Sequence, residues 1–261
     1  MLHYPNIDPV AIHIGPLAVR WYGLMYLAGF SCAYLFIRRL VKISGLPLRS
    51  DDVSDLLFAC VLGVVCGGRI GYVLFYNLSY FVDHPQEIFA LWNGGMSFHG
   101  GLLGVVIAAT LFCRKRRLPL GPIADILVVS SCFGLFFGRI GNFINGELWG
   151  RVTDVPWAMV FPAAGPYPRH PSQLYEALLE GPLLLAILLL VYRRRPQPWT
   201  VFCTFIATYA LARFMVEFVR EPDAQLGILS TGLTMGQTLS LPMMVVGIVG
   251  VVLLNRRGCK Q

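Results

Sequence analysis

Residues 181–195 read GPLLLAILLLVYRRR, an apolar run that ends against three arginines. Together with the residues before it, the run extends over 173–192. An α-helix needs about 20 apolar residues to cross the roughly 30 Å hydrocarbon core of a bilayer. A backbone that faces lipid must satisfy its hydrogen bonds internally, so a helix is the expected structure. The stretch predicts a membrane-spanning helix whose end is marked by charge.

The composition of the whole chain agrees with this prediction. Hydrophobic residues make up 56% of the 261 residues, and the mean hydropathy is +0.64. Charged residues make up only 13%, against about 25% in soluble domains. These values exclude a soluble enzyme, a disordered chain and a basic nucleic-acid-binding domain, despite the formal net charge of +7.

Seven apolar segments of suitable length predict an all-α, polytopic integral membrane protein with about seven transmembrane helices. The segments are 18–37, 56–76, 96–113, 120–138, 173–192, 199–218 and 236–254. We expect residues 1–261 to form a single transmembrane catalytic domain. The connection over 139–172 is long enough to hold a small periplasmic loop or arm, and its Pro and Gly content favours loops.

The basic residues predict the orientation of the chain. Fourteen of the 21 Lys and Arg residues follow the first, third, fifth and seventh segments, and therefore share one side of the membrane. By the positive-inside rule this side is the cytoplasm. We therefore expect a periplasmic N-terminus and a cytoplasmic C-terminus. The fourteen are Arg38, Arg39, Lys42, Arg49, Arg114, Lys115, Arg116, Arg117, Arg193, Arg194, Arg195, Arg256, Arg257 and Lys260.

Several ionisable side chains lie inside apolar segments, where insertion is costly and a functional role is the first hypothesis. They are Arg69, His99, Arg139, Arg213 and Glu217. A rise of about 1.5 Å per residue places them on four helices at one level, in the outer half of the bilayer. Three arginines near the headgroup level suit a phosphate, because guanidinium binds phosphate through paired hydrogen bonds.

Each of these residues also has a structural explanation. Arg213 and Glu217 are i,i+4 neighbours and could neutralise each other. Arg69 could snorkel outward or pin two helices together. A lone His at a helix start is more often structural than catalytic, but glycines flank His99 on both sides. They permit close approach of a ligand or of a neighbouring helix.

The densest polar run is GRIGNFINGELWGR at 138–151. It interleaves Arg, Asn and Glu with Phe, Leu and Trp, and predicts a segment that lies at the membrane interface and contacts lipid headgroups. At this run the sequence resembles the bacterial phosphatidylglycerol–prolipoprotein diacylglyceryl transferases. Residues 138–150 match the family signature GRxGNFxNxExxG. Further matches cover 21–26, 67–72, 94–101, 169–176 and 213–217, so the resemblance extends in order over nearly the whole chain.

The resemblance implies a transferase that acts in lipoprotein biosynthesis. Diacylglyceryl would pass from phosphatidylglycerol to the thiol of the lipobox cysteine of a prolipoprotein signal peptide, forming a thioether and releasing glycerol 1-phosphate. The expected location is the bacterial inner membrane, with the active site toward the periplasm. The partners are thus the lipid, the signal peptide and the bilayer, with no nucleic acid. No metal or organic cofactor is expected, because the peptide supplies the nucleophile and phosphate is the leaving group.

The resemblance also implies roles for individual residues. His99 is our prediction for the general base, because imidazole titrates near neutrality. Arg139 and Arg213 are predicted to hold the phosphate and to take up charge as it leaves. Tyr209, one helical turn before Arg213, is a competing candidate for the base. The residues assigned to substrate binding are Tyr22, Arg69, Arg139, Asn142, Asn145, Glu147, Gly150, Tyr209 and Glu217.

Within the substrate-binding group, Tyr22 and Asn142 are expected to hydrogen-bond the headgroup or the peptide. Glu147 and Glu217 are expected to orient the arginines.

Two other function classes stay open from the residues themselves. A transporter for an anion would use the intramembrane arginines as a pathway, but it also predicts polar groups in the cytoplasmic half. Few are found there apart from Asp125. An intramembrane serine protease would use Ser97 and His99, but residues two apart point to different sides of a helix.

Overall fold

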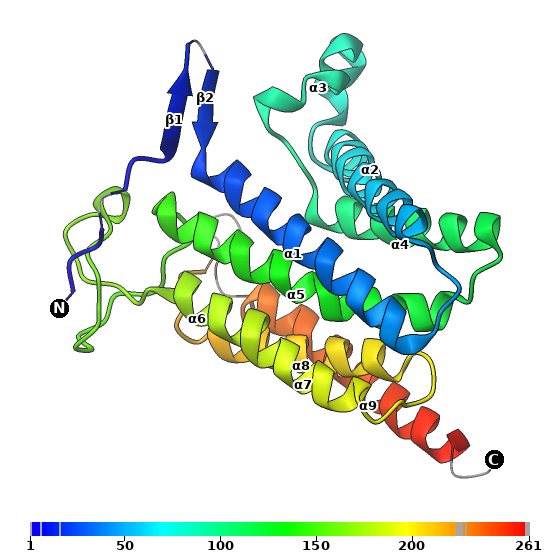
Figure 1. Cartoon of the computed structure of the whole chain (residues 1–261). Coiled ribbons are helices and arrows are strands. Elements are labelled where there is room, and N and C mark those ends of the chain that lie inside the picture. Colours follow the sequence, from blue (N-terminus) through cyan, green and yellow to red (C-terminus); the bar gives the residue numbers. More distant parts are fainter. Residues whose placement is uncertain (1, 6, 16, 223–226, 228, 259–261) are drawn as a thin grey trace. The chain divides into compact units, whose positions relative to one another are not determined.

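The computed structural model of the chain describes residues 2–5, 7–15, 17–222, 227 and 229–258 (Figure 1). It consists of two compact units. Unit 1 combines Met1–Phe36 with Asp125–Gln261, and unit 2 is Ile37–Ala124. Unit 1 holds most of the polar residues singled out in the sequence, and unit 2 holds Arg69 and His99.

The predicted all-α membrane fold is confirmed. Six helical stretches in the described residues are long and apolar enough to cross a membrane, and α8 is a shorter apolar helix of 17 residues, near the lower limit for a span. The helices are α1 (Trp21–Ser44), α2 (Ser50–Tyr76), α3 (Leu78–Asp83), α4 (Phe98–Arg116), α5 (Leu120–Ile144), α6 (Ser172–Leu178), α7 (Leu184–Tyr192), α8 (Thr200–Val216) and α9 (Met235–Gly258).

The structure refines the predicted segments in three places. Helix α1 continues to Ser44, past the basic residues that end its apolar run, because a helix can extend from the hydrocarbon into the interface. The segment at 173–192 is interrupted by a π-helical turn at Leu179–Leu183, since Pro182 has no N–H to donate within the helix. A short antiparallel hairpin, β1 (Val10–Ile14) with β2 (Leu17–Arg20), precedes α1 and was not predicted.

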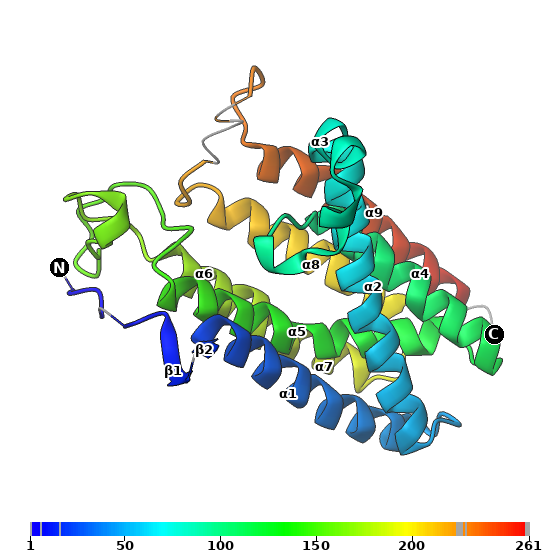
Figure 2. The ribbon, with the colours of Figure 1, turned by 90° about the horizontal axis from the view of Figure 1, so that it is seen from above.

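Unit 1 contains the N-terminal part of α1 together with α5, α6, α7, α8 and α9, and α9 packs on α8 (Figure 2). Glycines allow close contacts at three of the interfaces. A Cβ on Gly29 of α1 would lie 3.3 Å from the Cα of Gly134 on α5. Gly181 meets the Phe136 ring of α5, and Gly247 of α9 meets the backbone of α8. Close packing of small residues is the usual means of helix association in lipid.

In unit 2, α2 and α4 pack through facing glycines. A Cβ on Gly63 would lie 2.5 Å from the carbonyl oxygen of Gly104, and a Cβ on Gly67 would lie 2.9 Å from the Cα of Gly104. Gly71 lies equally close to Gly100. The two backbones therefore touch over two helical turns, and no side chain fits between them.

Replacing Gly104 with alanine is therefore expected to push α2 and α4 apart and destabilise unit 2. Overpacking of this kind costs about 1–3 kcal/mol. Thermal unfolding of the detergent-solubilised protein would show it as a lower melting temperature. The matched control is Gly134→Ala, because a Cβ at that α5 position meets nothing within 4 Å. An unchanged melting temperature for Gly104→Ala would contradict this packing.

Candidate active site

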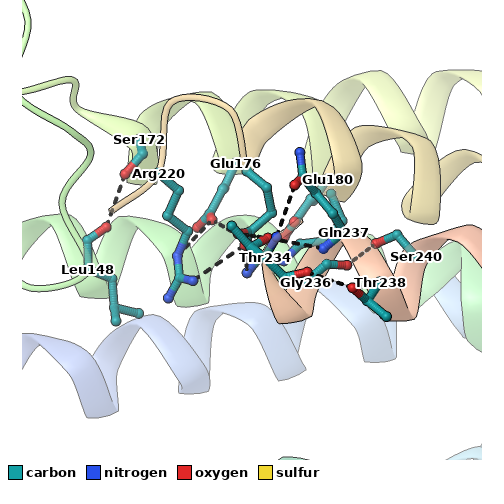
Figure 3. Close-up of polar contacts among 12 residues, drawn as sticks. Leu148, Ser172, Glu176, Glu180, Arg220, Thr234, Gly236, Gln237, Thr238 and Ser240 are labelled. Atoms are coloured by element: carbon teal, nitrogen blue, oxygen red, sulfur yellow. Dashed lines mark hydrogen bonds and ion pairs between the residues drawn. The ribbon is translucent and has the colours of Figure 1, made fainter. Parts of the chain in front are cut away.

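Two arginines from different helices share one buried carboxylate in unit 1, that of Glu176. Figure 3 shows this carboxylate with Glu180 and Arg220 close to it. Arg139 of α5 places Nε 3.0 Å from Oε2 of Glu176 on α6 and 3.2 Å from Oε2 of Glu180. Arg213 of α8 donates from Nη1 to Oε1 of Glu176 over 2.8 Å. Its Nη2 pairs with Glu217, four residues later on the same helix. The i,i+4 pairing expected from the sequence is therefore present, but it is part of a larger network.

The network continues to the C-terminal end of α8 and to the start of α9. Arg220 lies 3.7 Å from Glu176 and 3.4 Å from Glu217. Oε2 of Glu217 accepts a hydrogen bond of 2.7 Å from the hydroxyl of Thr234. We call the six charged residues the ion-pair network: Arg139, Glu176, Glu180, Arg213, Glu217 and Arg220.

Burial differs between the two signs of charge. The side chains of Glu176 and Glu180 are 0% exposed, whereas those of Arg139 and Arg213 are 19% and 17% exposed. A phosphate that reaches this site would therefore meet guanidinium groups before carboxylates. Within the described residues no group of three or more His, Cys, Asp and Glu side chains is placed to hold a metal.

Local features of the helices set the geometry of the network. Glu176 and Glu180 are four residues apart, and the π-helical turn that includes Glu180 widens the backbone between α6 and α7. Such turns occur often at functional sites. At the other end of α5, Asp125 accepts the backbone N–H groups of Trp199 (2.9 Å) and Phe202 (2.7 Å). It thereby caps the start of α8, which explains a polar residue there without a transport pathway.

The run at 138–151 is part helix and part turn. Helix α5 continues to Ile144, so Arg139 and Asn142 are helical. The carboxylate of Glu147 then accepts hydrogen bonds from the side-chain amides of Asn142 (2.9 Å) and Asn145 (3.2 Å). Three of the predicted binding residues therefore contact one another and hold the turn after α5.

The end of the run is held by backbone contacts. The N–H of Gly150 donates to the carbonyl of His170 over 2.9 Å, and Arg151 donates from Nε to the carbonyl of Arg220 over 3.0 Å. The hydroxyl of Ser172 and the amide of Gln173 donate to the carbonyls of Leu148 and Glu147, respectively. The run is thus tied both to the start of α6 and to the end of α8.

Tyr22 and Tyr209 border this region from other helices. Tyr22 of α1 lies against Gly141, where a Cβ would come 2.9 Å from its ring, and its hydroxyl lies 3.2 Å from that of Tyr26. Tyr209 of α8 stacks on Phe205 at 5.8 Å between ring centroids.

In unit 2, His99 lies in the first turn of α4 and is exposed. Together with Phe75, Tyr76 and Ser97 it lines an open pocket. Ser97 is the N-cap of α4, and its hydroxyl accepts the N–H of Gly100 over 3.2 Å. This cap explains Ser97 without a protease role.

Arg69 is 5% exposed and directs its guanidinium into the loop before α4. Nε donates to the carbonyl of Ile88 (2.8 Å), Nη1 to those of Gly94 (2.6 Å) and Gly95 (3.1 Å). Nη2 donates to the carbonyls of two further loop residues at 2.6 and 3.3 Å. All three guanidinium nitrogens thus contact backbone carbonyls, so in this structure Arg69 organises the loop that leads to His99.

Comparison with known proteins identifies the family. The family model described as prolipoprotein diacylglyceryl transferase matches residues 9–253. The chain belongs to this family. Proteins named phosphatidylglycerol–prolipoprotein diacylglyceryl transferase are similar to it over nearly their full length. The one from Geobacter sulfurreducens is 55% identical over 98% of both chains. The one from Vibrio cholerae is 54% identical over all of this chain and 96% of its own length.

Within this diacylglyceryl transferase fold, the structure brings some of the predicted site residues together. Arg139, Arg213 and Glu217 meet in the ion-pair network, and Asn142, Asn145 and Glu147 meet in the turn after α5. Gly150 joins that turn to His170. Arg69 and His99 belong to unit 2. The role of each residue in the reaction stays a prediction.

Two members of the ion-pair network of this transferase that contact Arg139 were not predicted from the sequence. Glu176 and Glu180 are acidic residues inside the apolar segment at 173–192. The rule that singled out Arg69 and Arg213, a charge inside a span, applies to them equally. Arg220 and Thr234 gave no such signal, because they lie between α8 and α9.

For this transferase we expect Arg69→Lys to loosen the loop at 85–95. An ammonium is a point charge on a flexible stem and does not replace the planar fork of donors. The variant should be cleaved faster in that loop by a protease under native conditions. Arg114→Lys, at an exposed position of α4, is the control and should match the wild type. Equal cleavage of the Arg69 variant would contradict the loop-organising role.

Proposed function

We propose that this chain transfers the diacylglyceryl group of phosphatidylglycerol to the thiol of a lipobox cysteine in a prolipoprotein. This is the first step of bacterial lipoprotein maturation. The observation that carries the proposal is the pair Arg139 and Arg213, held by one buried carboxylate within membrane-spanning helices of a diacylglyceryl transferase. Partly exposed guanidinium groups at this depth suit the phosphate of a lipid that remains in the bilayer.

In the proposed reaction the cysteine sulfur attacks the glyceryl carbon that bears the phosphate. A carbon–sulfur bond forms, the carbon–oxygen bond breaks, and its electron pair stays on the phosphate oxygen. Glycerol 1-phosphate leaves, and the thiol proton passes to a base. Arg139 and Arg213 would stabilise the charge that develops on the departing phosphate, which is often the largest contribution to catalysis.

We assign the base to His99, with Tyr209 as the alternative. A free thiol has a pKa near 8.5, so it is mostly protonated at neutral pH and gains from a base. If His99 is the base, His99→Ala should lower kcat by about 100- to 10,000-fold, the usual range for general base catalysis. The kcat of the folded variant is measured as the amount of peptide that gains the diacylglyceryl mass per minute. If His99→Ala keeps the wild-type kcat and Tyr209→Phe lowers it, the general base is Tyr209.

We further propose that the protein lies in the bacterial inner membrane with the site toward the periplasm, the N-terminus outside and the C-terminus inside. The distribution of Lys and Arg along the chain supports this orientation. Residues 1–261 would then act as one catalytic domain. Phosphatidylglycerol would enter laterally from the outer leaflet, because a site at headgroup depth is reached from the lipid itself.

The experiment that tests the function uses purified protein in detergent, phosphatidylglycerol and a synthetic lipobox peptide. We expect the peptide to gain the mass of one diacylglyceryl group, and glycerol phosphate to appear in equal amount. A peptide whose cysteine is replaced by serine is the control and should gain no mass. If the wild-type reaction yields neither lipidated peptide nor glycerol phosphate, the proposal is overturned, and anion transport becomes the leading alternative.

A further inference from the structure

One carboxylate lies between the two arginines on which the proposed function rests. Oε2 of Glu176 is 3.0 Å from Nε of Arg139, and Oε1 is 2.8 Å from Nη1 of Arg213. Each oxygen therefore serves a different helix. We infer that Glu176 is a positioning residue that sets the spacing of Arg139 and Arg213 so that both guanidinium groups can bind one phosphate.

Burial separates this role from substrate contact. The side chain of Glu176 is 0% exposed, so a lipid cannot reach it while the helices are packed. Arg139 and Arg213 keep 19% and 17% of their side chains exposed. Glu176 thus acts through the arginines and not on the lipid.

The contacts of Arg139 leave a free end for the lipid. It approaches Glu176 and Glu180 through Nε, and no hydrogen bond joins its two Nη groups to a residue that the structure describes. A phosphate needs such paired donors. Arg213 uses Nη1 for Glu176 and Nη2 for Glu217, which leaves its Nε.

Electrostatics explains why an anion is needed between the arginines. Two guanidinium groups held close together in a medium of low dielectric constant repel each other strongly. A buried carboxylate hydrogen-bonded to one and paired with the other attracts both and offsets part of their repulsion, whereas its removal leaves buried positive charge less compensated. Glu180 cannot replace Glu176 in this respect, because among the described residues Arg139 is the one partner with which Glu180 forms an ion pair.

The position of Glu176 is itself held by its neighbours on α6. Ser172 and Gln173, one turn earlier, donate to the carbonyls of Leu148 and Glu147 at 3.0 and 2.6 Å. Both side chains are fully buried. The start of α6 is thereby fixed to the turn after α5, and Glu176 is fixed relative to Arg139.

The test measures kcat and KM for phosphatidylglycerol with the full-length protein in detergent micelles, per folded molecule. We expect Glu176→Gln to lower kcat at least tenfold with a smaller change in KM, because misplaced arginines lose more in the transition state than in the ground state. Glu176→Asp keeps the charge but is one methylene shorter, and we expect it to lose activity similarly.

The control is Asp125→Asn. Asp125 of α5 is also a buried carboxylate, but it caps the start of α8 and lies toward the opposite end of α5 from Arg139. The replacement should lower the yield of folded protein and leave kcat per folded molecule unchanged, which is what a structural role predicts. Wild-type kcat in Glu176→Gln, or full recovery in Glu176→Asp, would overturn the inference while the proposed function stands.

A second measurement does not depend on transfer, so it remains informative if the wild-type protein proves inactive. Melting temperatures are compared for Arg139→Gln and Arg213→Gln in the wild-type and Glu176→Gln backgrounds. We expect each arginine replacement to cost less when Glu176 is absent, because contacting residues couple in a double-mutant cycle. Additive shifts for both arginines would overturn the shared contact.

Discussion

Replacing Arg213 with alanine is expected to lower kcat/KM for diacylglyceryl transfer by about 100- to 1,000-fold, the usual cost of removing one donor that stabilises a developing oxyanion. The loss has a second cause here. Glu176 and Glu217, which pair with Arg213, would remain buried with less compensating charge. Steady-state kinetics with phosphatidylglycerol and a lipobox peptide measure the effect.

Arg213→Lys separates charge from geometry. Lysine restores the positive charge but presents no planar fork to a phosphate and two carboxylates, so we expect only partial recovery. Arg114→Ala, at an exposed position at the end of α4, is the matched control and should keep full activity. If Arg213→Ala keeps more than a third of the wild-type kcat/KM, Arg213 does not bind the phosphate.

The second large effect is expected for Gly150→Ala. A Cβ at this position would lie 2.6 Å from the carbonyl oxygen of Val219 and 2.6 Å from the Cβ of His170. Neither neighbour can move alone, because Gly150 itself donates to the His170 carbonyl and the next residue, Arg151, donates its N–H to the Val219 carbonyl. We expect a destabilisation of about 1–3 kcal/mol or more, with loss of activity in the remaining folded protein.

The loss of activity follows from what the neighbours hold. Val219 lies between Glu217 and Arg220, so displacing its carbonyl shifts the end of the ion-pair network. Thermal unfolding and transfer rate are measured together. The control for stability is Gly138→Ala in the same run, where a Cβ meets nothing within 4 Å. A Gly150→Ala protein as stable and active as the wild type would show that this close packing is unimportant.

The predicted requirement for Gly150 illustrates what the resemblance could not explain. The family signature includes this glycine, and a role in substrate binding was predicted for it. The structure supplies a packing reason, since the strand-like backbone of 150 passes between His170 and Val219. Arg69 is a similar case. Its place inside a span marked it as functional, but its donors reach loop carbonyls that lie 18 to 26 residues later in the chain.

The membrane fold of this protein was determined by the sequence itself. Apolar runs and the arginines that end them report where the chain leaves hydrocarbon for water, which is a local property of consecutive residues. The predicted start of α5 at 120 and end of α2 at 76 therefore agree with the structure. The interruption after Leu178 also had a local cause, Pro182, although it was not predicted.

Only the tertiary structure decided which charges from different helices meet. Arg139 and Glu176 are 37 residues apart, as are Glu176 and Arg213. Their contact depends on how far each helix is rotated and how deeply it is placed, and these are set by packing at small residues such as Gly181. A single sequence does not encode rotation and depth locally. The arginines, and by the same rule Glu176, could therefore be found from the sequence, but the contact of Glu176 with both arginines required the fold.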